Sequence, residues 1–252
     1  MPELLARYEF KYLIDDEQMN GIRSYVRAFL DPDEFGDAGG NYWVNSLYMD
    51  TKDWRLARDT VDGVKIRYKL RMRCYEFDDT PVFCEIKARV GSSIIKSRAL
   101  IPRGSAEAVA GNTPVEDAHV PALKKSHQRD LDRFRNLVDE RDMRPRLWVR
   151  YHREAYVSPF GEGSRLTFDK QLQVALPVEP LFEPDMRWFE LVGLGQPTIL
   201  EMKFNGAHPK WMRDLVRAFD LRRISVAKYV LGAVQTKMFP FNTTVEHPWQ
   251  AW

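Results

Sequence analysis

The chain has 252 residues, of which 44% are hydrophobic, and a formal net charge of +2. This length suffices for one large β-rich domain or two ordinary ones with a proper core, and the small net charge excludes a general polyanion-binding coat. Two cysteines are too few for a disulfide scaffold, which favours a reducing compartment. Charges throughout positions 1–20 exclude a signal peptide, and no apolar run could span a bilayer, so a cytoplasmic protein is expected.

The first predicted strand, at positions 7–12, alternates charged and aromatic residues. Arg7, Glu9 and Lys11 share one face of it, and the three aromatic side chains share the other. A helix is expected next, with an acidic residue available for its N-cap, and it ends before Pro32. The pattern therefore predicts a strand with one polar face, followed by a packing helix.

The most regular alternation is K-I-R-Y-K-L-R-M-R, from Lys65 to Arg73, where every odd position is a cation and every even position is apolar. A period of two is typical of a β-strand, so all the cations share one face. Neighbouring charges about 7 Å apart repel by roughly 2 kcal/mol at an effective dielectric near 20. The row is therefore either the solvated face of a half-buried strand or a surface for a ligand with several negative charges.

Strands with one charged face recur along the whole chain. A three-stranded meander is predicted over 63–101, and a surface helical insert over about 104–143. The same patterns predict strands at 43–50, 146–156, 165–169 and 198–204, and helices at 209–219 and 225–238.

So many charged faces are best accommodated by closing the sheet, which removes its edges and gathers the polar faces into one lumen. The sequence therefore predicts an α+β fold, with a closed antiparallel β-barrel, a cation-lined lumen and helices packed outside. We expect one domain over 1–239 and a C-terminal tail without periodicity over 240–252. The acids expected on the lumen faces, which would partly neutralise the cations, are Glu9, Glu85, Asp169 and Glu201.

A series of short motifs covers about residues 5–235. They are R-Y-E-F-K at 7–11, Y-M-D at 48–50, K-I-R-Y-K-L-R at 65–71, E-I-K at 85–87, Y-H-R at 151–153, R-L-T-F-D at 165–169, E-M-K at 201–203 and A-K-Y at 227–229. In this order they resemble the VTC domain, a polyphosphate polymerase domain of the triphosphate tunnel metalloenzyme, or CYTH-like, superfamily.

Two positions refine this resemblance. Relatives with triphosphatase or cyclase activity typically begin with Glu-x-Glu-x-Lys, and Arg7 in place of the first Glu favours the VTC branch. The family's Ser-Lys-Tyr reads Ala227-Lys228-Tyr229 here, which removes one hydroxyl from the implied phosphate contacts. The regulatory helical domain that eukaryotic relatives carry ahead of the tunnel is not present, so a stand-alone prokaryotic form is expected.

The resemblance implies an enzyme that transfers the terminal phosphoryl group of ATP to a growing polyphosphate, dependent on Mn²⁺ or Mg²⁺. Phosphoryl transfer relies on positioning and charge stabilisation, which arginine forks and lysine charges supply. The side chains expected to act on the phosphates are Arg67, Lys69, Arg71, Lys87, Arg153 and Lys228. Those expected to bind substrate around them are Lys11, Lys65, Lys96, Arg165, Lys203 and Tyr48. The expected metal ligands are Glu201 first, then Glu9 and Glu85.

Two alternatives remain beside this function. An inorganic or organic triphosphatase needs almost the same residues, and a non-enzymatic polyphosphate-binding module needs only the cations. Nucleic acid is not expected, because its binding normally interleaves aromatic and basic positions, whereas Tyr68 lies on the face opposite the cations. Glu85 and Glu201 each precede a lysine by two positions, so ion pairing is an alternative to metal binding. The resemblance also leaves room for a membrane partner that receives the product.

Overall fold

One antiparallel sheet carries all eleven strands of the computed structural model, which describes residues 7–91, 93–111, 125–183, 186–191 and 198–237. The strands are β1 (Arg7–Ile14), β2 (Asp31–Pro32), β3 (Asn41–Asp50), β4 (Ile66–Cys74), β5 (Val82–Val90), β6 (Ser93–Ile101), β7 (Arg144–Val157), β8 (Arg165–Ala175), β9 (Phe189–Glu190), β10 (Thr198–Asn205) and β11 (Arg223–Ile224). The helices are α1 (Asp16–Val26), α2 (Arg55–Val61), the 3₁₀ turn η1 (Arg103–Ser105), α3 (Ala106–Gly111), α4 (Lys125–Glu140), α5 (Lys210–Ala218) and α6 (Lys228–Gln235).

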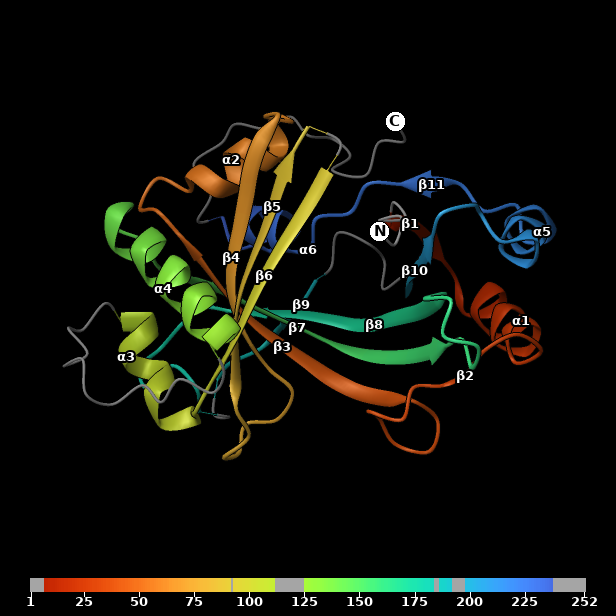
Figure 1. Ribbon diagram of the computed structural model, residues 1–252, viewed down its shortest axis with the longest axis horizontal. Helices are drawn as coiled ribbons and strands as arrows, with labels where there is room; N and C mark the ends of the chain where they lie inside the picture. Colours follow the sequence, from red (N-terminus) through yellow and green to blue (C-terminus); the bar gives the residue numbers. More distant parts are fainter. Residues whose placement is uncertain (1–6, 92, 112–124, 184–185, 192–197, 238–252) are drawn as a thin grey trace.

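The sheet bends strongly along its strand order, which is β11-β1-β10-β8-β7-β3-β4-β5-β6, with β2 added to β7 and β9 to β8. In Figure 1, β4, β5 and β6 stand upright while β7 and β8 run across them. The bend brings the polar faces of distant strands together, since Lys87 Nζ of β5 lies 3.5 Å from Glu9 Oε1 of β1. The α+β class and the large antiparallel sheet predicted from the sequence are thus present.

Hydrogen-bonded closure of the barrel, which the sequence analysis expected, is not found among the described residues. The strand order ends at β6 on one side and at β11 on the other, and β11 is only two residues long. Side-chain ion pairs such as that between Lys87 and Glu9 span the interior instead. A full barrel needs a ladder between its edge strands, and a two-residue edge strand cannot supply one.

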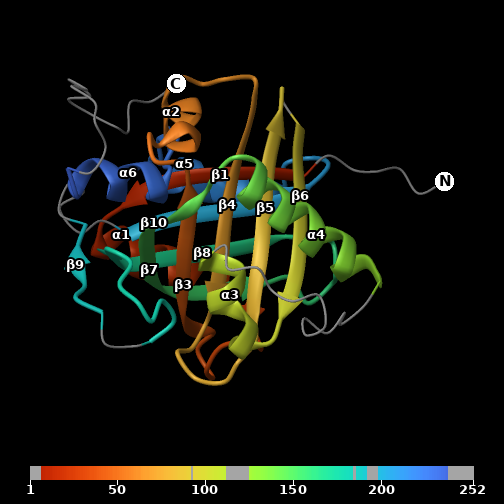
Figure 2. The same ribbon diagram turned by 90° about the vertical axis from the view of Figure 1, so that its left-hand side faces the viewer.

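Apolar outer faces of the sheet are covered by helices, as predicted. Phe134 and Val138 of α4 pack against the outward apolar side chains of β4, β5 and β6. Figure 2 shows α3 and α4 covering this face of the strands. On the other side, Ile22 of α1 and Leu215 of α5 pack with the outward side chains of β1, β8 and β10. The N-cap expected for the first helix is present, because Asp15 Oδ1 accepts a hydrogen bond of 2.8 Å from the Gln18 backbone N–H.

The last helix, α6, departs from the prediction that all helices lie outside. It packs on Leu147 and Val174, and Leu147 has the same parity on β7 as the lumen residues Tyr151 and Arg153. A Cβ at Gly232 would lie 2.7 Å from both Leu147 Cδ2 and Val174 Cγ1, so only glycine lets the helix approach this closely. Helix α6 therefore forms part of the wall of the interior.

Two other expectations concern segments at the limits of the described chain. The insert expected at about 104–143 contains η1, α3 and α4 in its described part. The tail expected at 240–252 lies outside the described residues. None of the helices in the described segments is long and apolar enough to cross a membrane.

Candidate active site

The polar faces of the strands enclose a cavity of about 1060 Å³. Among the described residues, fourteen lysines and arginines line it, against three carboxylates, although the whole chain carries a net charge of only +2. The lining comes from β1, β3, β4, β5, β6, β7 and β10, from α2, and from the segment that leads from β11 into α6. The local charge is therefore that of a site for a polyanion.

The cations of β4 all reach this cavity, as the alternation predicted, and several face cations on the neighbouring strands. Arg67 pairs in register with Arg89, and Lys69 with Lys87. Lys87 in turn stands opposite Lys96 of β6. Like charges in directly opposed positions destabilise a sheet, so this part of the fold is not arranged for its own stability.

Lys69 is the centre of this unbalanced part. Its side chain makes no ion pair or hydrogen bond within the described part of the chain. Burial first, and then the nearby charges of Lys11 and Lys87, lower the pKa of Lys69 from 10.5 to about 7. Burial also lowers the pKa of Lys87, although Glu9 opposes this. Negative charge arriving in the cavity would be most strongly attracted here.

Further along β4, the cations are held by a carboxylate. Arg71 Nε lies 2.6 Å from Glu85 Oε2, and the guanidinium groups of Arg98 and Arg73 approach the same carboxylate at 3.3 and 3.8 Å. Burial alone would raise the pKa of Glu85, but Arg71 and Arg73 lower it to about 2. Arg71 Nη1 also donates to the hydroxyl of Tyr48 at 3.2 Å. These contacts fix the Arg71 guanidinium at the cavity wall.

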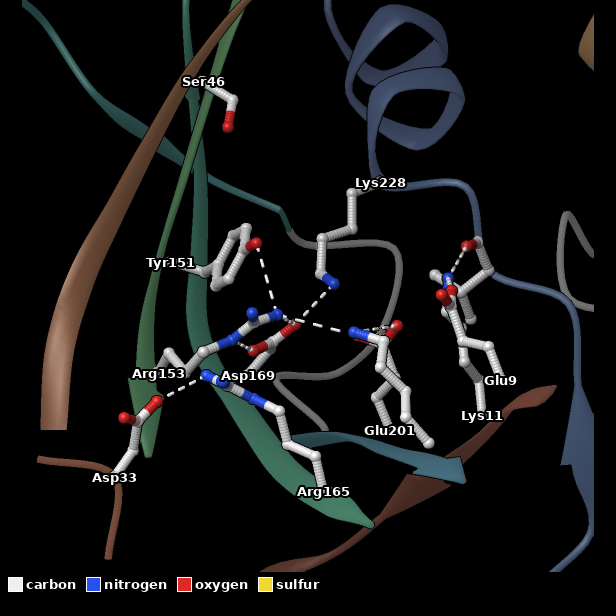
Figure 3. Close-up of polar contacts among 12 residues, drawn as sticks. Glu9, Lys11, Asp33, Ser46, Tyr151, Arg153, Arg165, Asp169, Glu201 and Lys228 are labelled. Atoms are coloured by element: carbon white, nitrogen blue, oxygen red, sulfur yellow. Dashed lines mark hydrogen bonds and ion pairs between the residues drawn. The ribbon is translucent and has the colours of Figure 1, made fainter. Parts of the chain in front are cut away.

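A second carboxylate, Asp169, organises the opposite wall (Figure 3). Its two oxygens accept bidentate hydrogen bonds of 2.7 and 2.9 Å from Arg153, and Oδ2 also accepts from Lys228 Nζ at 2.6 Å. Asp169 is fully buried, which alone would raise its pKa, but Arg153 and Lys228 lower the pKa to about 2. The sequence analysis placed Asp169 on a lumen face as one of the acids that partly neutralise the cations, and it did not identify which cations Asp169 contacts.

Glu9 and Glu201 form a pair of carboxylates between these walls. Burial and the nearby Glu201 would raise the pKa of Glu9, but Lys11 and Lys87 outweigh them and lower it below its ordinary value. Burial would raise the pKa of Glu201, but Lys203, with Nζ at 3.0 Å, and Lys11 hold it well below its usual range. The same two carboxylates raise the pKa of Lys11 in spite of its burial. Burial lowers the pKa of Lys203 to about 8, with Glu201 opposing.

The structure brings together every predicted site residue except one. Arg165 is absent from the described cavity lining, because its Nη2 is bound to Asp33 Oδ2 at 2.6 Å and to the Tyr42 hydroxyl at 2.8 Å. Lys65 and Lys96 line the cavity but are exposed. The lining also contains four arginines that were not selected from the sequence, namely Arg73, Arg89, Arg98 and Arg223. The first three follow the strand alternation, whereas Arg223 lies in a strand too short to show a period.

Residues 6–237 match the family model of the VTC domain. The chain belongs to the VTC domain family. This family includes catalytic domains of polyphosphate polymerases. No curated protein matched the chain. The solved structure of the PH1819 protein from Pyrococcus horikoshii OT3 is similar at 12% identity, covering 91% of this chain and 97% of that one, with a TM-score of 0.45.

A divalent metal, which tunnel enzymes related to the VTC domain typically use, can be tested against these side chains. No group of three or more His, Cys, Asp or Glu residues in the described segments could hold a metal alone. Glu9 and Glu201 do lie together, and Mg²⁺ or Mn²⁺ commonly takes one or two carboxylates and completes its shell with phosphate oxygens and water. The pair therefore fits a metal shared with a bound phosphate. Glu85, enclosed by three arginines, fits the ion-pair alternative instead.

Proposed function

We propose that this VTC domain is a polyphosphate polymerase that transfers the terminal phosphoryl group of ATP to a phosphate chain inside the cavity. The observation that carries the proposal is the set of opposed cations, Arg67 with Arg89 and Lys69 with Lys87, on walls with few acids. Such an arrangement costs stability unless a ligand with several closely spaced negative charges fills it. A linear chain of phosphates has this charge spacing.

The two walls have different tasks in this mechanism. Arg71 is fixed by Glu85 and Tyr48, and Arg153 is fixed by Asp169, so both present guanidinium N–H groups with little freedom to move. Fixed donors of this kind stabilise charge on the transferring phosphoryl group without having to reorganise. Lys69 and Lys87 add point charges along the chain.

The acceptor needs no nucleophilic side chain. Its terminal phosphate is already an anion near neutral pH, and positioning it in line with the nucleotide is the main requirement. A divalent metal held by Glu201 and Glu9 would neutralise charge on the phosphate oxygens when bound. Lys228, held in place by Asp169 at 2.6 Å, adds a further positive charge on this wall.

The decisive experiment incubates the purified protein with ATP and Mn²⁺ and separates the products on a polyphosphate gel. Chains longer than the starting nucleotide's triphosphate are expected. Phosphate release without any chains would identify a triphosphatase, and binding of tripolyphosphate without turnover would identify a polyphosphate-binding module. Either result would contradict the proposed polymerase.

The carboxylate pair provides a sharper version of this test. Glu201→Gln keeps the size of the side chain and removes its charge, so synthesis should fall by about a hundredfold or more while tripolyphosphate binding persists or tightens. Glu190→Gln, in exposed strand β9, is the matched control and should leave both unchanged. Full synthesis by Glu201→Gln would remove this residue from the mechanism.

A further inference from the structure

The inward rows of charge end abruptly at one end of the cavity. On β5 the inward positions run from Arg89 through Lys87 and Glu85, and the next position of the same parity is Phe83. Beyond the last inward cation of β4, Arg73, the corresponding position is Tyr75. Arg73 and Phe83 are direct partners in the β4–β5 register. The lumen side of both strands therefore changes from charged side chains to aromatic rings at this end, one inward position earlier on β5 than on β4.

Two further rings join these at the same end. Phe35, from the segment between β2 and β3, has its ring centroid 4.5 Å from that of Tyr75 and 5.0 Å from that of Tyr42 on β3. Tyr75 lies 5.7 Å from Tyr42 and 6.0 Å from Phe83, in edge-on geometry. We refer to Phe35, Tyr42, Tyr75 and Phe83 as the aromatic belt. Its four rings form one continuous chain of contacts over three neighbouring strands.

Arginines fasten the belt at both ends. The Arg98 guanidinium of β6 lies 3.6 Å from the ring centroid of Phe83, and its Nη2 donates to the Tyr75 hydroxyl at 3.4 Å. At the other end, Arg165 of β8 donates to the Tyr42 hydroxyl and to Asp33, two residues before Phe35. Together with these two arginines, the belt extends across the concave side of the sheet from β8 to β6. This is also the role that the structure gives to Arg165.

No ring of the belt is among the described residues that line the cavity. On this side the lining stops at Arg73, Glu85 and Arg98. At the other end it includes Lys65 and Ile94, which are exposed, the latter by 43%. On this side the cavity therefore ends at Arg73, Glu85 and Arg98, with the aromatic belt lying beyond them, whereas at the other end it borders on solvent.

We propose that the aromatic belt is a stop that limits how far a phosphate chain enters the cavity, and hence the length of the product. The ring faces carry negative potential and offer phosphate oxygens no hydrogen bond, and the hydroxyls of Tyr75 and Tyr42 are already engaged by Arg98 and Arg165. A hydrated anion that passes the belt would therefore be desolvated with little compensation. The inference rests on the proposed function. The acceptor occupies the space between Lys69 and the belt, the nucleotide enters from the solvent side, and growth ends when this space is full.

Binding alone tests the stop, independently of synthesis. Polyphosphates of defined length are mixed with excess protein, and the number of protein molecules per chain is measured by sedimentation. The wild type should bind only at chain ends, so that this number does not change with chain length. In Phe35→Ala and in Phe35→Ala combined with Tyr75→Ala, chains can thread through, and the number should rise with length.

Two further variants separate the belt from general effects. Asp33→Asn keeps all four rings but loosens their attachment to Arg165, and it should also allow threading. Phe160→Ala removes an 85% exposed ring in the β7–β8 turn and should behave as the wild type. Binding of polyphosphate to the outer surface of the protein is measured with Arg71→Glu, which reverses a charge inside the cavity. This contribution is subtracted from the number of protein molecules per chain.

The outcomes distinguish the stop from the function on which it rests. If the wild type synthesises chains, its products should be short, and those of the belt variants at least severalfold longer. Numbers per chain that already rise with length in the wild type, or equal product lengths in wild type and belt variants, would overturn the stop and leave the polymerase intact. Absence of any polyphosphate binding by the wild type would overturn both.

Discussion

The two walls of the cavity differ in how the charges of their cations are compensated. On the Asp169 wall, Arg153 and Lys228 are each within 2.7 Å of a carboxylate oxygen that is itself fully buried. On the β4–β5 wall, Arg71 contacts Glu85 and Lys87 contacts Glu9, but Lys69 faces Lys87 with like charge and has no ion pair among the described residues. Where carboxylates pair with the cations, the charges are already compensated in the folded protein, whereas unpaired cations are compensated only when an anion binds. The comparison indicates which residues serve stability and which serve binding.

Breaking the ion pairs of the Asp169 wall should have the largest effect. Asp169→Asn keeps the shape of the side chain but leaves Arg153 and Lys228 buried without an opposite charge, which should lower the free energy of unfolding by about 3–5 kcal/mol. Urea denaturation measures this difference. The exposed pair between Arg55 and Asp59 gives the matched control, because Asp59→Asn should cost no more than about 0.5 kcal/mol. Similar losses in the two variants would contradict the comparison.

On the β4–β5 wall, removal of an unpaired charge should have the opposite sign. Lys69→Met deletes a half-buried cation that has no ion-pair partner among the described residues, so at about pH 6 the unfolding free energy should rise by about 1–3 kcal/mol. Tripolyphosphate affinity should fall tenfold or more, since a charge-assisted contact contributes about 1.5–3 kcal/mol. Lys52→Met, at an exposed position, should change neither quantity. If Lys69→Met were less stable than the wild type, the positive charge of Lys69 would be compensated by an interaction that the described contacts do not include.

The difference in unfolding free energy between Lys69→Met and the wild type should change with pH in one direction. The pKa of Lys69 falls from 10.5 to about 7 on folding, so the unfolded chain binds more protons between these pH values. Its destabilising effect is full below about pH 7 and is lost as the pH rises towards 10.5. The stabilisation by Lys69→Met should therefore shrink with rising pH, as measured by thermal unfolding. A constant difference would show that Lys69 is not titrating in this range.

The same titration should be visible in binding. A bound tripolyphosphate raises the pKa of Lys69, so at about pH 8 the wild type should take up more protons on binding than Lys69→Met does. Calorimetry in buffers of different ionisation enthalpy measures proton uptake. Equal uptake by the two proteins would place the phosphates away from Lys69.

The smallest effect on stability is expected at the solvent end of the wall. Arg67 is only partly buried and faces Arg89, so Arg67→Ala should leave the melting temperature nearly unchanged or slightly higher. Its affinity for tripolyphosphate should still fall about tenfold, as titration calorimetry can measure. Equal affinities in wild type and variant would favour the alternative that the cations of β4 form only a solvated strand face.

Much of the site could be predicted from the sequence because strand parity specifies a face. The alternation from Lys65 to Arg73 placed each of its cations in the lumen, and the same argument held for Lys87 and Glu201. Parity does not specify which strands are neighbours, however. The opposition of Lys69 and Lys87 follows from the β4–β5 register, which depends on the turn and on packing.

Other features had too little signal for prediction. Asp169 has the right parity, but its partner Lys228 is 59 residues away in the chain, and only the fold brings them together. The position of α6 inside the curve of the sheet depends on Gly232, whose importance follows from the approach of Leu147 and Val174. Tyr75 and Phe83 share the parity of the cations, whereas Phe35 lies in an irregular segment without any period. The lack of barrel closure among the described strands could not be predicted, because the edge strand β11 has only two residues and shows no alternation.

The opposed cations of β4 and β5 also connect the amount of this protein to the supply of its ligand. Any phosphate chain that fills the cavity stabilises the folded state by RT ln(1 + [L]/Kd), about 2.7 kcal/mol at a hundred times Kd. Proteases act mainly on the transiently unfolded population, which shrinks as that free energy grows. Cells rich in phosphate chains should therefore retain more of this protein at the same rate of synthesis. Lys69→Met should weaken this response, because it is expected to bind the phosphate chain with tenfold or more lower affinity.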